Sequence, residues 1–199
     1  MRHVKVQQGT EEWLQARLGV LTASNFSKFI TPGGKPSSQA EGEINKLIAE
    51  RITGQRADMF TSPWMERGTE LEPKARELFE FMTNHSVDQA GLILMDDYQI
   101  GCSPDGIIGS AGLEIKCPAP ATHVKYLRSG QLPEEYVAQV QGSMAVTGFD
   151  TWYFMSFHPS IEPLVLCVER DPVYIEKLQA ILIAAEQTIN EEVKKYGKQ

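Results

Sequence analysis

The pattern of apolar and polar positions divides the chain into helical outer parts and a strand-rich middle. Apolar residues spaced three and four apart predict helices at 10–17, from about 22 or 24 onward, and at 44–53, 63–84, 122–129, 133–147 and 172–196. Short apolar runs over 90–117 predict three antiparallel strands, and 151–158 and 164–170 predict two more. Helices on either side of such strands favour an α/β or α+β fold, in which a central mixed β-sheet is flanked by helices.

Prolines and glycines mark where these elements begin, bend or stop. Gly54 and Gly148 predict the ends of two helices. Pro73 lies inside the helix that begins at Ser62 and Pro63, and since proline has no backbone donor we expect either a kink or two helices there. The adjacent Gly33 and Gly34, with two prolines, predict a mobile surface loop over 31–42.

Composition excludes several classes of protein. A chain of 199 residues that is 42% hydrophobic is expected to fold as a single domain over 1–199. It contains no apolar run near the roughly 20 residues of a membrane-spanning helix and no signal peptide, so we expect no membrane attachment and a cytoplasmic location. Its three cysteines have no C-x-x-C spacing, which argues against a disulfide framework or a zinc site. A formal charge of −7 restricts any contact with nucleic acid to a local surface.

The residues with the most informative chemistry are Asp105, Glu114 and Lys116. The glycines at 109 and 112 predict a turn, which places Asp105 on one strand of a hairpin and the other two residues on the next. Side chains alternate along a strand, so Glu114 and Lys116 share a face. Two carboxylates held together favour a hard divalent cation such as Mg²⁺, and the lysine would hold or help deprotonate a water for phosphodiester hydrolysis. The same residues also occur in ordinary surface turns, but apolar neighbours on the strand favour the catalytic interpretation.

Longer motifs surround this constellation. The strings C-S-P-D-G-I at 102–107 and G-L-E-I-K-C-P at 112–118 resemble the core of the phage lambda exonuclease family, the YqaJ-like viral recombinases of the PD-(D/E)XK nuclease superfamily. Further matches follow in the same order, namely W-x₃-R-x-G at 13–19, L-T-A-S at 21–24, G-x₃-E at 68–72, A-R at 75–76, A-Q-V-Q at 138–141 and W-Y-F at 152–154. The resemblance spans about residues 12–170 and implies a restriction-endonuclease-like core.

The resemblance implies an activity with its cofactor and partners. It implies a metal-dependent deoxyribonuclease, a 5′-to-3′ exonuclease that digests linear double-stranded DNA from its ends and leaves 3′ single strands for phage-type recombination by annealing. It implies Mg²⁺, with two ions expected and Mn²⁺ as a substitute. It also implies a homotrimeric ring around DNA, a single-strand annealing protein as partner, and a phage or prophage origin with a cytoplasmic location in a bacterial host.

The resemblance also assigns roles to residues of this sequence. Metal ligands would be Asp105, Glu114, the backbone carbonyl of Ile115 and, as a further acidic group, Glu72. Lys116 would be the water-activating base or an electrostatic stabiliser, and Gln139 would face the active site. Residues expected around the 5′-phosphate are Arg17, Thr22, Ser24 and Ser103, and the residue expected as a wedge at the DNA end is Met65.

Plainer roles remain open for several of these residues. Glu72 and Gln139 are also compatible with solvated positions on helices, and Thr22 or Ser24 with a helix cap. Arg17 is compatible with a surface arginine and Met65 with a core position. The family's loop arginine that enters DNA has no clear match in 31–42, where Lys35 is the only cation.

Two other functions remain as alternatives. One is a structure-specific endonuclease of the same superfamily, and the other is a DNA-end-binding module that has lost its chemistry. The intact set of Asp105, Glu114 and Lys116 argues against the second alternative.

Overall fold

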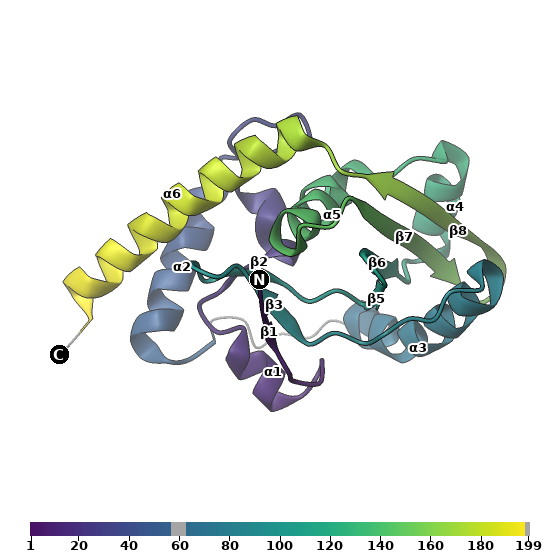
Figure 1. The fold of residues 1–199 in the computed structure, drawn as a ribbon, viewed down its shortest axis with the longest axis horizontal. Helices are drawn as coiled ribbons and strands as arrows, with labels where there is room; N and C mark the ends of the chain where they lie inside the picture. Colours follow the sequence, from purple (N-terminus) through teal and green to yellow (C-terminus); the bar gives the residue numbers. More distant parts are fainter. Residues whose placement is uncertain (57–62, 198–199) are drawn as a thin grey trace.

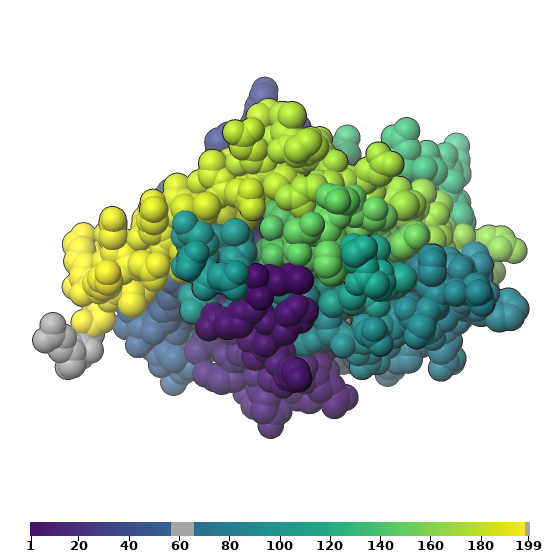
Figure 2. Space-filling model, in the orientation of Figure 1, coloured from purple at the N-terminus to yellow at the C-terminus, as the bar shows by residue number. Residues whose placement is uncertain are grey.

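The computed structural model describes residues 1–56 and 63–197, with the side chains of residues 63–65 outside this description. Its strands form two four-stranded mixed sheets, which helices flank (Figure 1). The mixed α/β fold class expected from the sequence is therefore confirmed, although the strands are divided between two sheets instead of one central sheet. Figure 2 shows that the N-terminal segment and the C-terminal helix share one face of the molecule.

The first sheet contains four very short strands in the order β1-β3-β4-β2, namely β1 (Arg2–Val4), β3 (Leu92–Leu94), β4 (Ile100–Cys102) and β2 (Leu21–Thr22). The β2 and β4 strands are parallel, and the other neighbours are antiparallel. Neither β1 nor β2 was predicted from the sequence, because two or three residues are too few to give a clear alternation.

The second sheet is longer and has the order β5-β6-β7-β8. Its strands are β5 (Gly106–Ile108), β6 (Ala111–Lys116), β7 (Thr151–His158) and β8 (Ile161–Glu169). Only the β6–β7 pair is parallel. The last strand begins three residues before the predicted start and includes Pro163, which is compatible with an edge strand because proline cannot donate to a further neighbour.

The prediction of three antiparallel strands over 90–117 is wrong. The segment contains four strands, β3 to β6, with two in each sheet. The chain passes between the sheets at Ser103, Pro104 and Asp105, where proline lacks the backbone donor that a continuing ladder needs. The predicted turn is also shorter, since β6 begins at Ala111 and pairs with Ile108 across Gly109 and Ser110.

The helices largely follow the predictions. They are α1 (Glu11–Ala16), α2 (Ala40–Thr53), α3 (Pro63–Thr83), α4 (Pro120–Ser129), α5 (Glu134–Thr147) and α6 (Pro172–Tyr196). Thr10 caps α1, and left-handed Gly54 and Gly148 end α2 and α5. The helix expected near residue 22 is a 3₁₀ helix, η1 (Ala23–Lys28), and α3 continues as one helical element through Pro73. The expected cap of α3 at Ser62 lies outside the described residues.

Two layers of apolar side chains cover the opposite faces of the second sheet. Leu113, Ile115 and Met155 pack against Ala75 and Phe79 of α3. On the other face, Trp152 and Phe154 of β7 pack against Val140 and Met144 of α5, together with Ile175 of α6. Side chains alternate along β6, so Glu114 and Lys116 point to the face opposite Leu113 and Ile115. This is the face that α5 covers.

The long α6 lies along α2 over the first part of the chain (Figure 1). Leu47 of α2 and Leu182 and Ile189 of α6 belong to one buried cluster that also includes Phe26 and Phe29. Among the described residues, no helix is long and apolar enough to cross a membrane.

Candidate active site

A pocket of about 170 Å³ lies where the two sheets meet. It is lined by side chains from the N-terminal segment, from the β4–β5 connection, from β6 and from α5, namely Gln8, Trp13, Arg17, Thr22, Ala23, Ser24, Ser103, Asp105, Glu114, Lys116, Gln139 and Ser143. Eight of the candidate residues, the first and last of which lie more than a hundred positions apart in the sequence, therefore line this one pocket.

The acidic pair and the lysine lie together in this pocket. Glu114 is buried, with 3% of its surface exposed, and its Oε1 forms an ion pair with Lys116 Nζ at 2.6 Å. Asp105 precedes β5, and its Oδ2 accepts a hydrogen bond from the backbone N–H of Ile115 at 2.6 Å. The predicted sharing of one face by Glu114 and Lys116 is confirmed.

Electrostatics in this group are unfavourable for two free carboxylates. Burial, together with the charge of Glu114, raises the pKa of Asp105 well above its usual value. Burial by itself lowers the pKa of Lys116, but the Glu114 and Asp105 carboxylates outweigh it and the net pKa is raised. Lys116 is therefore an ammonium group at neutral pH.

Gln139 is directed into the pocket from α5. Its Nε2 donates to Glu114 Oε1 at 2.6 Å, so the same oxygen accepts from Gln139 and pairs with Lys116. The plainer interpretation of Gln139 as a solvated helix residue is therefore wrong. Since Nε2 is the donor, the amide fixes the orientation of the Glu114 carboxylate.

Glu72 lies near the acidic pair and is paired with a neighbour on its own helix. It lies close enough to Glu114 for burial and that carboxylate to raise its pKa, but its side chain forms an ion pair with Arg76 on the next turn of α3. It does not line the pocket. Within the described residues, no three His, Cys, Asp or Glu side chains cluster closely enough to hold a metal by themselves.

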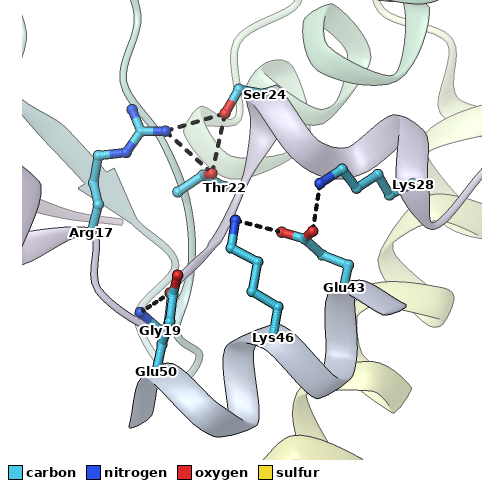
Figure 3. A network of polar contacts seen from close by, with 8 residues as sticks. All are labelled: Arg17, Gly19, Thr22, Ser24, Lys28, Glu43, Lys46 and Glu50. Atoms are coloured by element: carbon cyan, nitrogen blue, oxygen red, sulfur yellow. Dashed lines mark hydrogen bonds and ion pairs between the residues drawn. The ribbon is translucent and has the colours of Figure 1, made fainter. Parts of the chain in front are cut away.

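A second group of polar side chains forms the other wall of the pocket. Arg17 is the C-cap residue of α1, and its guanidinium donates to Thr22 Oγ1 at 3.3 Å and to Ser24 Oγ at 3.2 Å (Figure 3). The guanidinium also stacks 4.2 Å from the centre of the Trp13 ring. Burial, with a further contribution from Arg56, lowers the pKa of Arg17 to about 10, which leaves it charged at neutral pH. Arg17 is thus not a free surface arginine.

The hydroxyl groups beside Arg17 are oriented by one another. Thr22 Oγ1 and Ser24 Oγ lie 3.2 Å apart, and both accept from Arg17. Although Thr22 occupies the cap position of η1, its hydroxyl is used by this group rather than by the helix backbone. Ser103 Oγ accepts a hydrogen bond from Trp13 Nε1 at 3.0 Å. We call Arg17, Thr22 and Ser24 the cradle.

Sequence reasoning missed three residues that organise this pocket. Gln8 Nε2 donates to the backbone carbonyls of Ala90 and Pro104 at 2.8 and 2.7 Å, which fixes the segment before Asp105. Trp13 supports both Arg17 and Ser103, a role that its spacing of one helical turn from Arg17 could have suggested. Arg76 Nε donates to the backbone carbonyl of Asp105 at 3.1 Å. The expected wedge, Met65, has a side chain outside the described residues.

Comparison with known proteins places this geometry in a family. The model of the YqaJ-like viral recombinase domain matches residues 12–150. Among solved structures, an alkaline exonuclease (LHK-Exo) from Laribacter hongkongensis is 32% identical with a TM-score of 0.85, and covers 94% of this chain and 95% of that one. The same enzyme in complex with dAMP gives 33% identity and a TM-score of 0.84 at the same coverage.

A more distant structure shares the fold. A phage related exonuclease from Haemophilus somnus 129PT is 16% identical with a TM-score of 0.68, and the match covers 88% of this chain and 96% of that one. A search of curated protein sequences gives no match. The family model and the alkaline exonuclease together show that this chain belongs to the YqaJ-like viral recombinase family and is a nuclease of that family.

Proposed function

We propose that this protein is a Mg²⁺-dependent exonuclease that digests linear double-stranded DNA from its ends in the 5′-to-3′ direction and leaves 3′ single strands for recombination by annealing. One observation carries the proposal. A single pocket contains both a group formed by the half-buried Asp105, the buried Glu114 and a lysine, and the guanidinium–hydroxyl cradle. The first group has the chemistry to hydrolyse a phosphodiester, and the second has the chemistry to bind a phosphate.

The donor atoms of the pocket fit a hard divalent cation. Burial, followed by the charge of Glu114, raises the pKa of Asp105, and a cation held by the two carboxylates would offset this cost. The residues that would hold it are Asp105, Glu114 and the carbonyl of Ile115, with Glu72 as a further acidic group if it leaves Arg76. A bound divalent cation supplies charge stabilisation at the attacked phosphate and makes a nearby water more acidic. Mg²⁺ is the expected ion, in two copies, with Mn²⁺ as a substitute.

The protein's own side chains supply the rest of the chemistry. Because its pKa is raised, Lys116 is suited to hold the attacking water and to stabilise negative charge in the transition state, more than to accept a proton. Gln139 keeps Glu114 oriented through their 2.6 Å hydrogen bond. Arg76 and Gln8 hold the backbone on both sides of Asp105.

The cradle is proposed to bind the 5′-terminal phosphate. A terminal monophosphate carries about two negative charges at neutral pH, by analogy with a phosphorylated side chain, whereas an internal diester carries one. The Arg17 guanidinium, stacked on Trp13 and beside two hydroxyls, therefore gains more from a terminal phosphate. Binding of that phosphate would set the scissile bond over the carboxylate pair and favour degradation from the 5′ end.

The assembly and partners are also part of the proposal. We propose a homotrimeric ring around DNA and a single-strand annealing protein that receives the 3′ strand, as the family resemblance implies. A chain with a formal charge of −7 holds DNA best if its basic residues face an enclosed channel. Light scattering of the active enzyme should give three chains, and a monomer at active concentrations would contradict the ring.

The experiment that tests the function uses a linear duplex labelled at one 5′ end or at one 3′ end, with a closed circle in the same tube. With Mg²⁺ we expect early release of the 5′ label, retention of the 3′ label and survival of the circle, and with EDTA no release. Rapid linearisation of the circle would favour the endonuclease alternative. End binding without any Mg²⁺-dependent digestion would favour the module without chemistry.

The role of Arg17 needs a separate comparison of 5′-phosphate and 5′-hydroxyl duplexes. The wild-type protein should cut the phosphorylated duplex faster than the hydroxyl duplex. Arg17→Ala should lower the ratio of these two rates by about 10- to 100-fold, because a hydrogen bond to a charged group contributes about 1.5–3 kcal/mol. An unchanged ratio of rates in the variant would exclude Arg17 as the phosphate reader.

A further inference from the structure

Gly19 lies in the bend between Arg17 and Thr22, and α2 holds its peptide groups on both sides. Its N–H donates to Glu50 Oε2 at 3.1 Å, and its carbonyl accepts from Arg51 Nε at 2.7 Å. Gly19 has a φ of +67°, and a Cβ at this position would lie 2.5 Å from Arg51 Cγ. The bend therefore requires glycine and is fixed by two neighbouring residues of one helix, one of which is drawn in Figure 3.

Arg51 is in turn anchored on α6. Its guanidinium pairs with both carboxylate oxygens of Glu186, at 3.2 and 2.7 Å, and also donates to Asn190 Oδ1 at 2.9 Å. Glu186 is 3% exposed, and Asn190 Nδ2 donates back to it at 3.2 Å. A bidentate pair of this kind fixes the plane of the guanidinium, which the flexible ammonium of a lysine would not do.

The far end of the same segment is also held by α2. Lys28, the last residue of η1, places its Nζ 2.6 Å from Oε2 of Glu43, which is 4% exposed (Figure 3). Glu43 and Glu50 are seven residues apart and thus lie on one face of α2. This face therefore holds segment 17–28, which contains the whole cradle, at both its ends.

The polar contacts of α2 and α6 determine the position of segment 17–28 more than they contribute to the stability of the fold. Buried ion pairs add little net stability, because the desolvation of the charges offsets their attraction. The α2–α6 contact is already covered by apolar side chains, among them Leu47, Leu182 and Ile189. In contrast, the cradle contacts of Arg17 at 3.2 and 3.3 Å depend on where the bend at Gly19 directs the chain.

We propose that Arg51, oriented by Glu186, is a positioning residue that sets the bend at Gly19 and so directs Arg17 at the terminal phosphate. The preference for 5′-phosphorylated ends is then determined partly by α2 and α6, outside the pocket. This inference rests on the proposed role of Arg17 as the phosphate reader.

The test compares Arg51→Lys and Glu186→Gln with Arg17→Ala and with the control Ile189→Val. The control trims a buried methyl group from the same helix and leaves the polar network intact. Two quantities are measured well below each variant's Tm. These are kcat/KM on 5′-phosphate and 5′-hydroxyl duplexes, and equilibrium binding of both duplexes in EDTA by fluorescence anisotropy.

Arg51→Lys should lower the phosphate preference by about tenfold, since displacements of about 1 Å have effects of up to about 10²-fold. The loss should appear in KM and in metal-free binding of the phosphorylated duplex, with kcat on the hydroxyl duplex unchanged. Glu186→Gln should give a smaller loss in the same direction, and Ile189→Val none.

Different results overturn different parts of the argument. If Arg17→Ala erases the preference while both Arg51→Lys and Glu186→Gln keep it, the positioning role is wrong and the role of Arg17 stands. An equal loss in Ile189→Val would mean that general destabilisation is the cause, which also overturns the positioning role. If the wild-type protein has no preference, the reader role of Arg17 fails, and this inference fails with it.

Discussion

Replacing Asp105 by Asn should abolish cleavage and stabilise the protein in the absence of metal. The charge of Glu114 acts on Asp105, and two unit charges about 4 Å apart repel by about 4 kcal/mol at an effective dielectric constant of about 20, with less repulsion at a larger separation. Asn keeps an oxygen that accepts the Ile115 N–H hydrogen bond and removes one charge. The variant also loses the attraction between Asp105 and Lys116, which offsets part of this gain. The net stabilisation is about 1–2 kcal/mol, which raises the Tm by about 2–8 °C for a chain of this size.

The sign of the pH dependence follows from the raised pKa of Asp105. A carboxyl group whose pKa is higher in the folded state destabilises that state at pH values above its ordinary pKa of about 3.9, and the cost is relieved as the pH falls through the raised value. Glu72, with its pKa also raised, acts in the same direction. The Tm of the metal-free wild-type protein should therefore rise as the pH is lowered from neutral toward the ordinary carboxyl pKa of about 4, and Asp105→Asn should reduce this dependence.

The assay is thermal unfolding in EDTA, followed by circular dichroism, with cleavage of linear DNA measured in parallel. Addition of Mg²⁺ should raise the Tm of the wild-type protein and leave that of Asp105→Asn nearly unchanged. A lower metal-free Tm in the variant would mean that the Asp105 charge does not destabilise the fold, and Mg²⁺-dependent cleavage by the variant would exclude Asp105 as an essential metal ligand.

Three further predictions concern neighbouring residues. Lys116→Ala should lose about 10²- to 10⁴-fold in cleavage rate and keep its affinity for metal in calorimetry, and a loss of metal affinity instead would mean that its role is misassigned. Gln139→Leu should lower kcat by about tenfold because Glu114 loses its orienting donor, and an unchanged kcat would limit Gln139 to packing. Gly19→Ala should cost about 1–3 kcal/mol of stability through its positive φ and its approach to Arg51, whereas Gly130→Ala, with a similar φ and open space around it among the described residues, should cost less in the same denaturant titration.

Long periodic elements of the fold could be predicted from the sequence. The α6 helix has the predicted bounds, since its apolar stripe runs over 25 residues with an Asp cap at its start. The α5 helix ends at Gly148 as expected, because only a residue tolerant of positive φ fits that position. These elements are specified by local chemistry, which a single sequence contains.

The division into two sheets could not be predicted from local pattern. The strands β1 and β2 contain three and two residues, and their pairing partners lie about 80 to 90 positions away in the chain. Such pairing is decided by tertiary contacts rather than by alternation. The same holds for Gln8, whose function is to hold the carbonyls of Ala90 and Pro104.

The candidate site could be predicted in part. The alternation along β6 correctly placed Glu114 and Lys116 on one face, because that rule depends only on strand geometry. The interaction of Glu72 with Arg76 was not expected, although the two are four residues apart on α3 and thus neighbours on its surface. That ion pair occupies Oε1 of the Glu72 carboxylate.

Asp105 and Glu114 are proposed to form the centre of hydrolysis. The most direct measurement is the Mg²⁺-dependent release of nucleotides from a linear duplex by the wild-type protein and by Glu114→Gln, which keeps the size of the side chain and removes its charge. We expect release by the wild-type protein and release at the background rate by the variant, with both proteins folded by circular dichroism. Wild-type rates of Mg²⁺-dependent release by Glu114→Gln would contradict a catalytic role for this carboxylate.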